Sequence, residues 1–413
     1  MTFQLSSSVL ILLFSVLCAS LFGGETVVPW SAFRGPKHDG VVRITMQPPA
    51  AWPKALKVVW EANIGAGFSS PITDGTYVFL QQRSDKEELI VAYDLATGKA
   101  MWRTATATFK ESQTHDPAPT PLVSPYGLLF VHSLTGTVMC LDAKSGKQNW
   151  RRDLPSEWKA GPLGQSYGIA ASPVFGTADT LVFAIGDKKN GKVLGLKTRD
   201  GSTAWEHATA APGYSTFLPF TASGLPCIAT MLYDDMVAYK KEGDAFKPAF
   251  SFPVRGGGDG NSSMPMLLGD NKLLITSLEA TVALNILPGA ATCSEAWRVD
   301  SGGDLSTPVC VNGRIYLHNV YELMCLNAAD GKLLSKLAMD GQYCALLAWG
   351  DVLICRLHDG AMKFVDIKGE TLKVLAAYPA PDAPGESWSA PMPVSPTRII
   401  VRSPGKLQCL TWE

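Results

Sequence analysis

The chain has 413 residues, a formal net charge of −1 and only 18% charged residues. It contains no basic run, so we expect no nucleic-acid partner. Division by typical domain size would suggest two or three domains, but the repeats described below argue for one.

The first 20 residues predict a signal peptide. An apolar run from Val9 to Leu17 is followed by the small residues Cys18-Ala19-Ser20, which is typical of a secretory signal with cleavage near Ser20. The run is too short to span a membrane in the mature chain. We therefore expect a periplasmic or secreted protein without a transmembrane span. The alternative is lipoprotein anchoring at Cys18, although Leu17 departs from the small residue usual before a lipidated cysteine.

A sequence motif then recurs along the chain. It is complete at 92–102 (AYDLATGKAMW), returns at 140–150 (CLDAKSGKQNW), and is seen again around Gly201 and Gly331. A glycine lies four residues after the Asp-type position, and a tryptophan, where present, eight after it. Such a repeat indicates an array of equivalent structural units.

Proline residues mark the start of the units, each after a Ser/Thr/Ala-rich approach. They stand at positions 71, 121, 173, 219, 265, 308 and 391. Their spacing is 43 to 52 residues, except for a final interval of 83 that holds two units, the second starting near Tyr343 without a proline. Eight units of about 40–50 residues are typical of four-stranded propeller blades.

Blade one illustrates the predicted strands. We expect an inner strand at 70–73, further strands at 77–81 and 89–93, and an outer strand at 100–104, with turns at Asp74-Gly75 and at the Asp-x-x-Thr-Gly segment. The last blade, 390–412, supplies only three strands. The segment Lys57 to Asn63 resembles an outer strand and is expected to complete it, which removes an open sheet edge.

The predicted third strands align in all eight blades. One column holds Ala92, Cys140, Gly195, Ala238, Ala283, Cys325, Phe364 and Cys409, and seven of these eight residues, all but Phe364, are small. The next column is always large and apolar: Tyr93, Leu141, Leu196, Tyr239, Leu284, Leu326, Val365 and Leu410. Sheets covered on both faces lose polar alternation, and large side chains against small ones allow dense packing. The sequence therefore predicts an all-β, eight-bladed β-propeller of four-stranded antiparallel blades over 57–413, after an N-terminal extension at 21–56.

Eight cysteines remain after Cys18. Cys140, Cys325 and Cys409 share the small column, which indicates buried apolar roles rather than disulfides. Cys344 and Cys355 could pair within blade seven. The sequence leaves that alternative open.

The repeated Ala-x-Asp-x-x-Thr-Gly-x-x-x-Trp resembles the tryptophan-docking motif of pyrroloquinoline-quinone (PQQ) repeat propellers, over residues 57–412. That superfamily contains quinoprotein alcohol dehydrogenases and the propeller lipoprotein of the outer-membrane β-barrel assembly machinery. The opening Trp30 to Gly40 resembles that of exported PQQ-like repeat proteins. The resemblance implies that docking tryptophans pack between neighbouring blades, and that blades four, six and seven, which lack the tryptophan, have looser contacts. These structural residues are Trp60, Trp102, Trp150, Trp205, Trp297, Gly98, Gly146, Gly201 and Gly331.

Quinoprotein chemistry would, by this resemblance, need a vicinal disulfide, Ca²⁺ held by acidic and amide groups, and a catalytic Asp. The chain has no Cys-Cys pair and no C-x-x-C-H for haem. Asp259, Asn261 and Asp304 are the only plausible calcium ligands. No histidine spacing suggests a metal site. We therefore expect no catalytic residue, no cofactor and no metal, with PQQ and Ca²⁺ as the alternative.

Candidate binding residues lie on the connections between each outer strand and the next inner strand, which converge over the propeller funnel. Aromatic and charged groups on converging loops suit a ligand or peptide site. They are Phe68, His115, Tyr167, Tyr214, Arg255, Asp259, Asp304, Gln342 and Trp388. Phe68 and Trp388 are favoured because they flank the seam between blades eight and one.

Three functional hypotheses follow. The first is a monomeric, non-catalytic scaffold of a Gram-negative-type envelope that binds a protein or polysaccharide. The second is a degenerate PQQ-dependent alcohol or sugar dehydrogenase. The third is an outer-membrane protein assembly subunit, against which the weak lipidation signal speaks.

Overall fold

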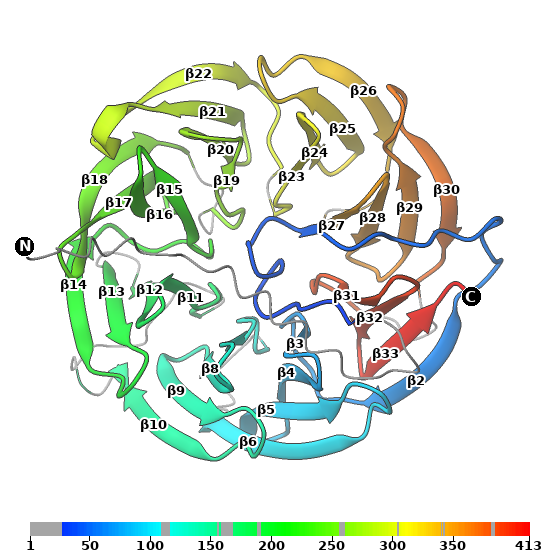
Figure 1. Ribbon diagram of the computed structural model, residues 1–413, viewed down its shortest axis with the longest axis horizontal. Helices are drawn as coiled ribbons and strands as arrows, with labels where there is room; N and C mark the ends of the chain where they lie inside the picture. The colour runs from blue at the N-terminus through cyan, green and yellow to red at the C-terminus, as the bar shows by residue number, and fades with distance from the viewer. Residues whose placement is uncertain are drawn as a thin grey trace, which may run out of the picture.

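The computed structural model describes residues 27–108, 116–154, 157, 168–187, 191–255, 261–303, 305–339, 341, 343–380 and 385–413. Eight antiparallel sheets stand in a ring around a central axis (Figure 1). The predicted eight-bladed β-propeller is therefore confirmed. The predicted signal peptide and Cys18 lie outside the described residues.

Each blade runs from an inner strand at the axis to an outer strand at the rim. The strands of blades one and two are β3 (Ile72–Thr73), β4 (Tyr77–Arg83), β5 (Glu87–Asp94), β6 (Ala100–Thr108), β7 (Leu122–Val123), β8 (Leu128–His132), β9 (Thr137–Asp142) and β10 (Gln148–Asp153). Those of blades three and four are β11 (Val174–Thr177), β12 (Thr180–Gly186), β13 (Gly191–Lys197), β14 (Thr203–Thr209), β15 (Leu218–Ala222), β16 (Leu225–Met231), β17 (Asp235–Glu242) and β18 (Ala245–Pro253).

The second half of the ring repeats this plan. Blades five and six are β19 (Met266–Leu267), β20 (Lys272–Thr276), β21 (Thr281–Ile286), β22 (Cys293–Val299), β23 (Val309–Val311), β24 (Arg314–His318), β25 (Glu322–Asn327) and β26 (Leu333–Ala338), with the short 3₁₀ turn η1 (Pro288–Ala290) before β22. Blades seven and eight are β27 (Cys344–Trp349), β28 (Val352–Leu357), β29 (Met362–Asp366), β30 (Lys373–Tyr378), β31 (Met392–Ser395), β32 (Arg398–Ser403), β33 (Lys406–Thr411) and β2 (Lys57–Asn63).

The ring closes as predicted. Strand β2 pairs antiparallel with β33, from Lys57 opposite Thr411 to Asn63 opposite Lys406. The first and last parts of the propeller therefore share one sheet, and blade eight has its four strands.

The inner strand of blade one is shorter than predicted, because Pro71 cannot donate to the ladder. Its pairing starts at Ile72 rather than Ser70. Pro219 is an exception to the predicted register. Leu218 pairs with Ala229, as Ile72 pairs with Phe79, so Phe217 and not Pro219 occupies the position of Pro71.

The small column of the third strand has a structural reason beyond sheet packing. Its residues face the docking position of the outer strand, as Ala92 faces Trp102 and Gly195 faces Trp205. A Cβ atom on Gly195 would lie 2.4 Å from the Trp205 ring. Blade seven inverts the sizes, with Phe364 opposite Ala376. A β-bulge follows this pair in every blade.

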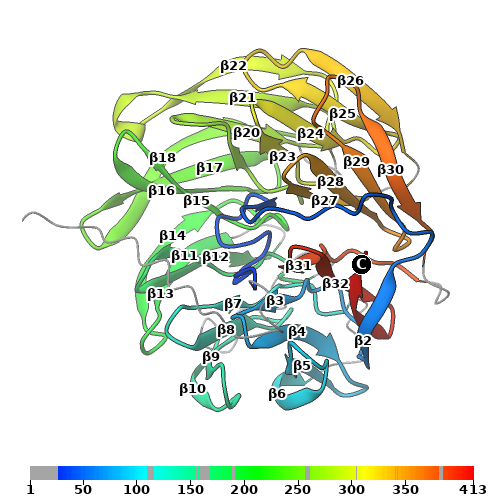
Figure 2. The same ribbon diagram turned by 45° about the vertical axis from the view of Figure 1, so that its right-hand side comes forward.

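Residues 27–56, which we call the strap, cross one face of the ring (Figures 1 and 2). Backbone N–H groups at the ends of inner strands donate to the strap: Thr73 to Trp30, Val123 to Ser31, and Ala348 to Gly40. Strand β1 (Val41–Val42) adds to β27 in parallel and makes blade seven five-stranded. The strap therefore closes the axis at the face that carries the first-to-second-strand turns, which we call the turn face.

Candidate functional site

The opposite face carries the connections that run from each outer strand to the next inner strand. We call it the connector face. Because strands alternate in direction, second strands end at this face. The predicted binding residues belong to it, and the strap does not cover it.

Hydroxyl groups at the start of the inner strands link neighbouring blades around the axis. Ser70 donates its backbone N–H to Thr120 Oγ1 at 3.0 Å, and Thr120 donates in turn to Ser172 Oγ at 3.0 Å. The same bond joins Ser172 to Thr216, Met264 to Thr307, and Ala390 to Ser70. This explains the Ser/Thr-rich approach to each proline: the hydroxyl satisfies a buried donor of the preceding blade.

A second set of buried polar groups stands at the ends of the second strands. Arg356 donates to the Arg402 carbonyl, Arg402 donates to the Gln81 carbonyl at 2.8 Å, and Gln81 Nε2 donates to the His132 carbonyl at 2.9 Å. His132 Nε2 then lies 2.7 Å from the Ala171 carbonyl oxygen of blade three. These four side chains link successive blades, so their polar groups stabilise the packing of the propeller.

Both arginines are buried, and within the described residues their hydrogen bonds go to carbonyl and hydroxyl oxygens. Burial lowers the pKa of Arg402 to about 9 and that of Arg356 to about 10. Arg402 Nη2 donates to the Gly65 carbonyl at 3.0 Å, and a Cβ atom on Gly67 would lie 2.4 Å from the same nitrogen. The Gly65-Ala66-Gly67 segment is thus shaped to pass over this guanidinium.

Docking tryptophans lie against turn glycines of the next blade. Trp60 Nε1 donates to the Leu95 carbonyl at 3.0 Å, and a Cβ atom on Gly98 would lie 2.3 Å from the Trp60 ring. Trp102 with Gly146, Trp150 with Gly201 and Trp297 with Gly331 repeat this contact. Trp205 differs, because the hairpin of blade four runs on to Glu242 and Ala245 and offers no such turn. Its Nε1 is buried without a partner.

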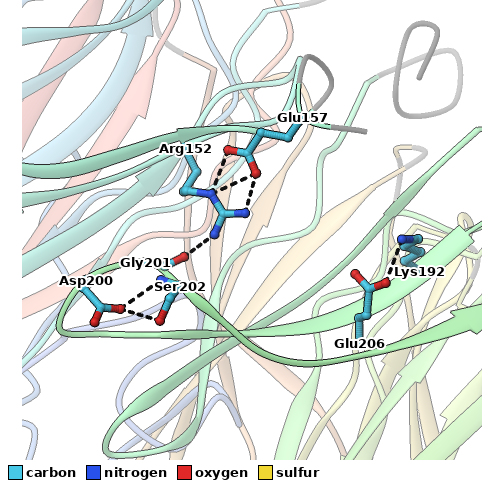
Figure 3. Close-up of polar contacts among 7 residues, drawn as sticks. All are labelled: Arg152, Glu157, Lys192, Asp200, Gly201, Ser202 and Glu206. Carbon is cyan, nitrogen blue, oxygen red and sulfur yellow. Dashed lines mark hydrogen bonds and ion pairs between the residues drawn. The ribbon is translucent and has the colours of Figure 1, made fainter. Parts of the chain in front are cut away.

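Charged groups add to the seam between blades two and three. Figure 3 shows Arg152 bonded to the Gly201 carbonyl and paired with Glu157, whose Oε1 lies 2.7 Å from Arg152 Nε. Asp200 accepts from the Ser202 backbone N–H in the same turn at 2.9 Å. These are exposed pairs, and their contribution to stability is small.

Of the predicted binding residues, Phe68, Tyr214, Arg255 and Trp388 are described. Phe68 is half-buried and donates its backbone N–H to Pro117. Tyr214 donates its backbone N–H to the Asn261 carbonyl. Arg255 is exposed and pairs with Glu279 at 3.2 Å. The other five lie outside the described residues: His115, Tyr167, Asp259, Asp304 and Gln342.

Trp388 belongs to an aromatic site at the seam between blades seven and eight. Its ring centroid lies 5.0 Å from that of Tyr343, and its Nε1 donates to Glu386 Oε2 at 2.7 Å. Both rings are half-buried, and burial raises the pKa of Tyr343. We call Tyr343, His358, Glu386 and Trp388 the aromatic site.

His358 holds the two connections of this site together. It donates its backbone N–H to the Tyr343 carbonyl at 3.1 Å and accepts from the Ser387 N–H at 2.5 Å. Its Nδ1 is buried without a hydrogen-bond partner. Below it, Arg356 Nε donates to Ser387 Oγ at 3.2 Å. The site therefore presents two half-buried aromatic rings and the exposed Glu386 carboxylate on a rigid base, while the His358 ring nitrogen is itself buried. The sequence pointed to Trp388 but not to its partner Tyr343.

The predicted calcium ligands do not form a site in the described part of the chain. The Asn261 amide donates to the Leu232 and Tyr233 carbonyls at 2.9 and 3.1 Å, so this side chain serves the blade-four connection. Asp259 and Asp304 lie outside the described residues. Among the residues that the structure does describe, no group of three His, Cys, Asp or Glu side chains is placed to hold a metal ion. We therefore derive no step through a quinone-associated calcium.

Two further observations bear on the sequence predictions. The eight cysteines after Cys18 are free thiols, including Cys344 and Cys355. Across the described ranges, no helix is both long enough and apolar enough to span a bilayer.

Known proteins show where this propeller belongs structurally. Residues 51–223 match a family model described as outer membrane protein assembly factor BamB. No curated protein sequence matches the chain. Quinohemoprotein alcohol dehydrogenase from Comamonas testosteroni superposes with a TM-score of 0.69 at 12% identity, covering 93% of this chain and 80% of its own.

Two other solved structures are similar. BamB from Moraxella catarrhalis has a TM-score of 0.63 at 12% identity, with 86% of this chain and 100% of its own covered. A europium-containing methanol dehydrogenase has a TM-score of 0.68 at 13% identity, with 91% and 89% covered. Sequence identities this low show a shared fold only and give no information about activity. The family-model match and these structures confirm the resemblance to PQQ-type and BamB-type propellers.

Proposed function

We propose that this protein is a non-catalytic binding scaffold of a bacterial envelope, which takes a protein or carbohydrate partner on its connector face. The aromatic site carries the proposal. Half-buried Trp388 and Tyr343 offer apolar faces, and the exposed Glu386 offers a carboxylate beside them. This combination is what recognition sites use.

The hydrogen bonds of the buried polar side chains support a binding role rather than a catalytic one. The arginines, Gln81 and His132 below the connector face donate to backbone carbonyls of the next blade. Groups committed to holding blades together are not available to a substrate. We further propose export to the periplasm or the medium, with the mature protein a monomer.

Site-specific photo-crosslinking tests this proposal. A photoreactive amino acid replaces Trp388 in cells that make the protein, and a matched variant carries it at Tyr126, which is 84% exposed on the turn face. We expect adducts of defined mass from position 388 and none from 126. Equal adducts at both positions, or none at 388, would overturn the connector-face assignment.

A role in outer-membrane protein assembly is a second candidate, favoured by the family-model match at 51–223. It requires the position-388 adduct to contain an envelope assembly protein. An adduct with polysaccharide alone would remove this candidate while leaving the scaffold proposal intact.

A degenerate quinoprotein dehydrogenase is the third candidate, supported by the fold of the solved dehydrogenases. It predicts stoichiometric quinone absorbance and dye reduction with alcohols or sugars after PQQ and Ca²⁺ are added. Turnover that Asp304→Ala abolishes would replace the scaffold proposal.

A further inference from the structure

The outer-strand bulges divide the ring into two halves. Each bulge adds one residue to the outer strand just before the docking position. In order from blade one to blade eight, the added residues are Met101, Asn149, Ala204, Ala249, Ala296, Leu334, Leu375 and Val59. They are large and aliphatic in blades six, seven, eight and one, and polar or alanine in blades two to five.

The residue before the added one is also large and aliphatic in blades six to eight, where it is Leu333, Val374 and Val58. It is Ala100 in blade one, and Gln148, Thr203, Pro248 and Glu295 in blades two to five. We call the exposed aliphatic members the rim arc: Leu333, Leu334, Val374, Val58, Val59 and Met101. Their exposed fractions are 51, 46, 37, 50, 41 and 49%.

Outer strands β26, β30, β2 and β6, which carry the rim arc, follow one another along the rim (Figure 1). Single exposed apolar residues are ordinary, but a run over four successive blades marks an interaction surface. Equivalent positions of a propeller lie at the same height along its axis. The rim arc therefore forms one level edge on the side of the turn face.

A lysine lies two residues before the added residue in each of these blades, as Lys147 also does in blade two. Lys332, Lys373, Lys57 and Lys99 are all exposed. Lys332 lies 3.4 Å from Asp330, whereas the described residues give the other three no carboxylate partner. Three of the four lysines therefore form no ion pair within the described part of the chain.

Composition distinguishes a lipid surface from a protein partner. Protein interfaces are enriched in aromatic residues and arginine and depleted in lysine. The rim arc has aliphatic side chains and lysines, with no aromatic residue and no arginine. Aliphatic groups that enter the headgroup region beside lysines that attract anionic lipids are typical of peripheral membrane binding.

We propose that the rim arc rests on an anionic phospholipid surface, so that the connector face and its aromatic site point away from the bilayer. This goes beyond the scaffold function and rests on a different part of the molecule. It gives the propeller a defined orientation toward a membrane without a membrane-spanning helix.

Vesicle co-sedimentation of the full-length protein tests this. Vesicles of phosphatidylcholine alone are compared with vesicles that also contain phosphatidylglycerol. We expect binding to the anionic vesicles that weakens as salt is added. The double variant Val59→Glu/Leu334→Glu should bind at least about ten-fold more weakly. Each of Lys57→Gln and Lys373→Gln should lower binding roughly five-fold.

The repeat provides a matched control. Asn149→Glu/Ala204→Glu introduces the same charges at equivalent bulge positions of blades two and three, and should bind as the wild type does. Equal thermal melting of both double variants shows that they are folded. Wild-type protein that ignores anionic vesicles, or arc and control variants that bind equally, would overturn the proposal. So would an arc variant that changes only the oligomeric state.

Discussion

Seams between blades are sealed in two different ways in this propeller. Blades eight, one, two and five each pack a tryptophan on the turn glycine of the next blade, and its indole donates to a turn carbonyl. Blades six and seven have Ser335 and Ala376 in the equivalent place. Their seams depend on groups from outside the repeat.

The strap supplies much of what these seams lack. Trp349 Nε1 donates to the Ile44 carbonyl and Trp412 Nε1 to the Gln47 carbonyl, each at 2.9 Å. Trp52 of the strap lies with its ring centroid 4.5 Å from that of Phe364. The comparison teaches that loss of the repeat motif in blades six and seven coincides with the addition of a non-repeating segment. This segment packs the seams of blades six and seven, two of the three expected to be looser.

The largest expected effect comes from breaking the strap-sealed side. Trp349 is fully buried at 0% exposure, so Trp349→Ala should lower the free energy of unfolding by about 3–5 kcal/mol. Denaturant unfolding measures this. Trp388→Ala, at a half-exposed position of the connector face, is the control and should cost much less. Similar losses for both would contradict the role given to the strap.

Gly98→Ala breaks a tryptophan-sealed seam. Gly98 has φ of 71°, and the new Cβ would lie 2.3 Å from the Trp60 ring, so backbone strain and overpacking add to about 3 kcal/mol. Gly127→Ala is the matched control, because φ is 76° and nothing lies within 4 Å. It should cost about 1 kcal/mol. Equal melting temperatures for the two variants would show that the docking contact is not tight.

Acid should weaken the strap through His38. Burial lowers the pKa of His38 to about 4, from an ordinary value of 6.5. The unfolded chain therefore takes up a proton in this range while the folded chain does not, and stability falls as the pH drops from 6.5 to 4, by about 3 kcal/mol in all. His38→Gln should remove this part of the pH dependence of unfolding. An unchanged pH profile in the variant would refute the assignment.

The smallest effect sharpens the comparison among the tryptophans themselves. Trp60→Phe removes a hydrogen bond to Leu95 and should cost about 1 kcal/mol more than Trp205→Phe, because Trp205 Nε1 has no partner to lose. Thermal melting of the two variants gives the difference. If Trp205→Phe proved the more costly, the indole hydrogen bond would not explain the motif.

Much of the fold was predictable because the same structural unit occurs eight times, so equivalent positions can be compared between blades. The spacing of Gly98 and Trp102 fixes a turn and a docking position, and the column from Ala92 to Cys409 reports the same contact in every blade. Closure by Lys57 to Asn63 followed from counting strands. The predicted register was wrong at Pro219, because a proline at the second position of an inner strand cannot be told in sequence from one that precedes the strand.

The candidate site was less accessible to sequence reasoning. Second strands can be aligned as third strands were, and that would have shown polar residues at Gln81, His132, Arg356 and Arg402. The contact of Tyr343 with Trp388 joins two connections 45 residues apart that carry no shared motif. The strap was predicted only as part of an N-terminal extension at 21–56, with no position on the ring, because segments outside a repeat have no equivalent in sequence that reveals where they pack.

Native-state hydrogen exchange tests the central claim that the strap seals the ring. The Ala348 amide donates to Gly40 of the strap at 2.8 Å, while amides of β24 lie within a repeat blade. The account predicts that Ala348 and β24 amides exchange with the same free energy, that of global unfolding. Exchange of Ala348 through a smaller opening, with β24 still fully protected, would show that the strap detaches from an intact ring and would contradict it.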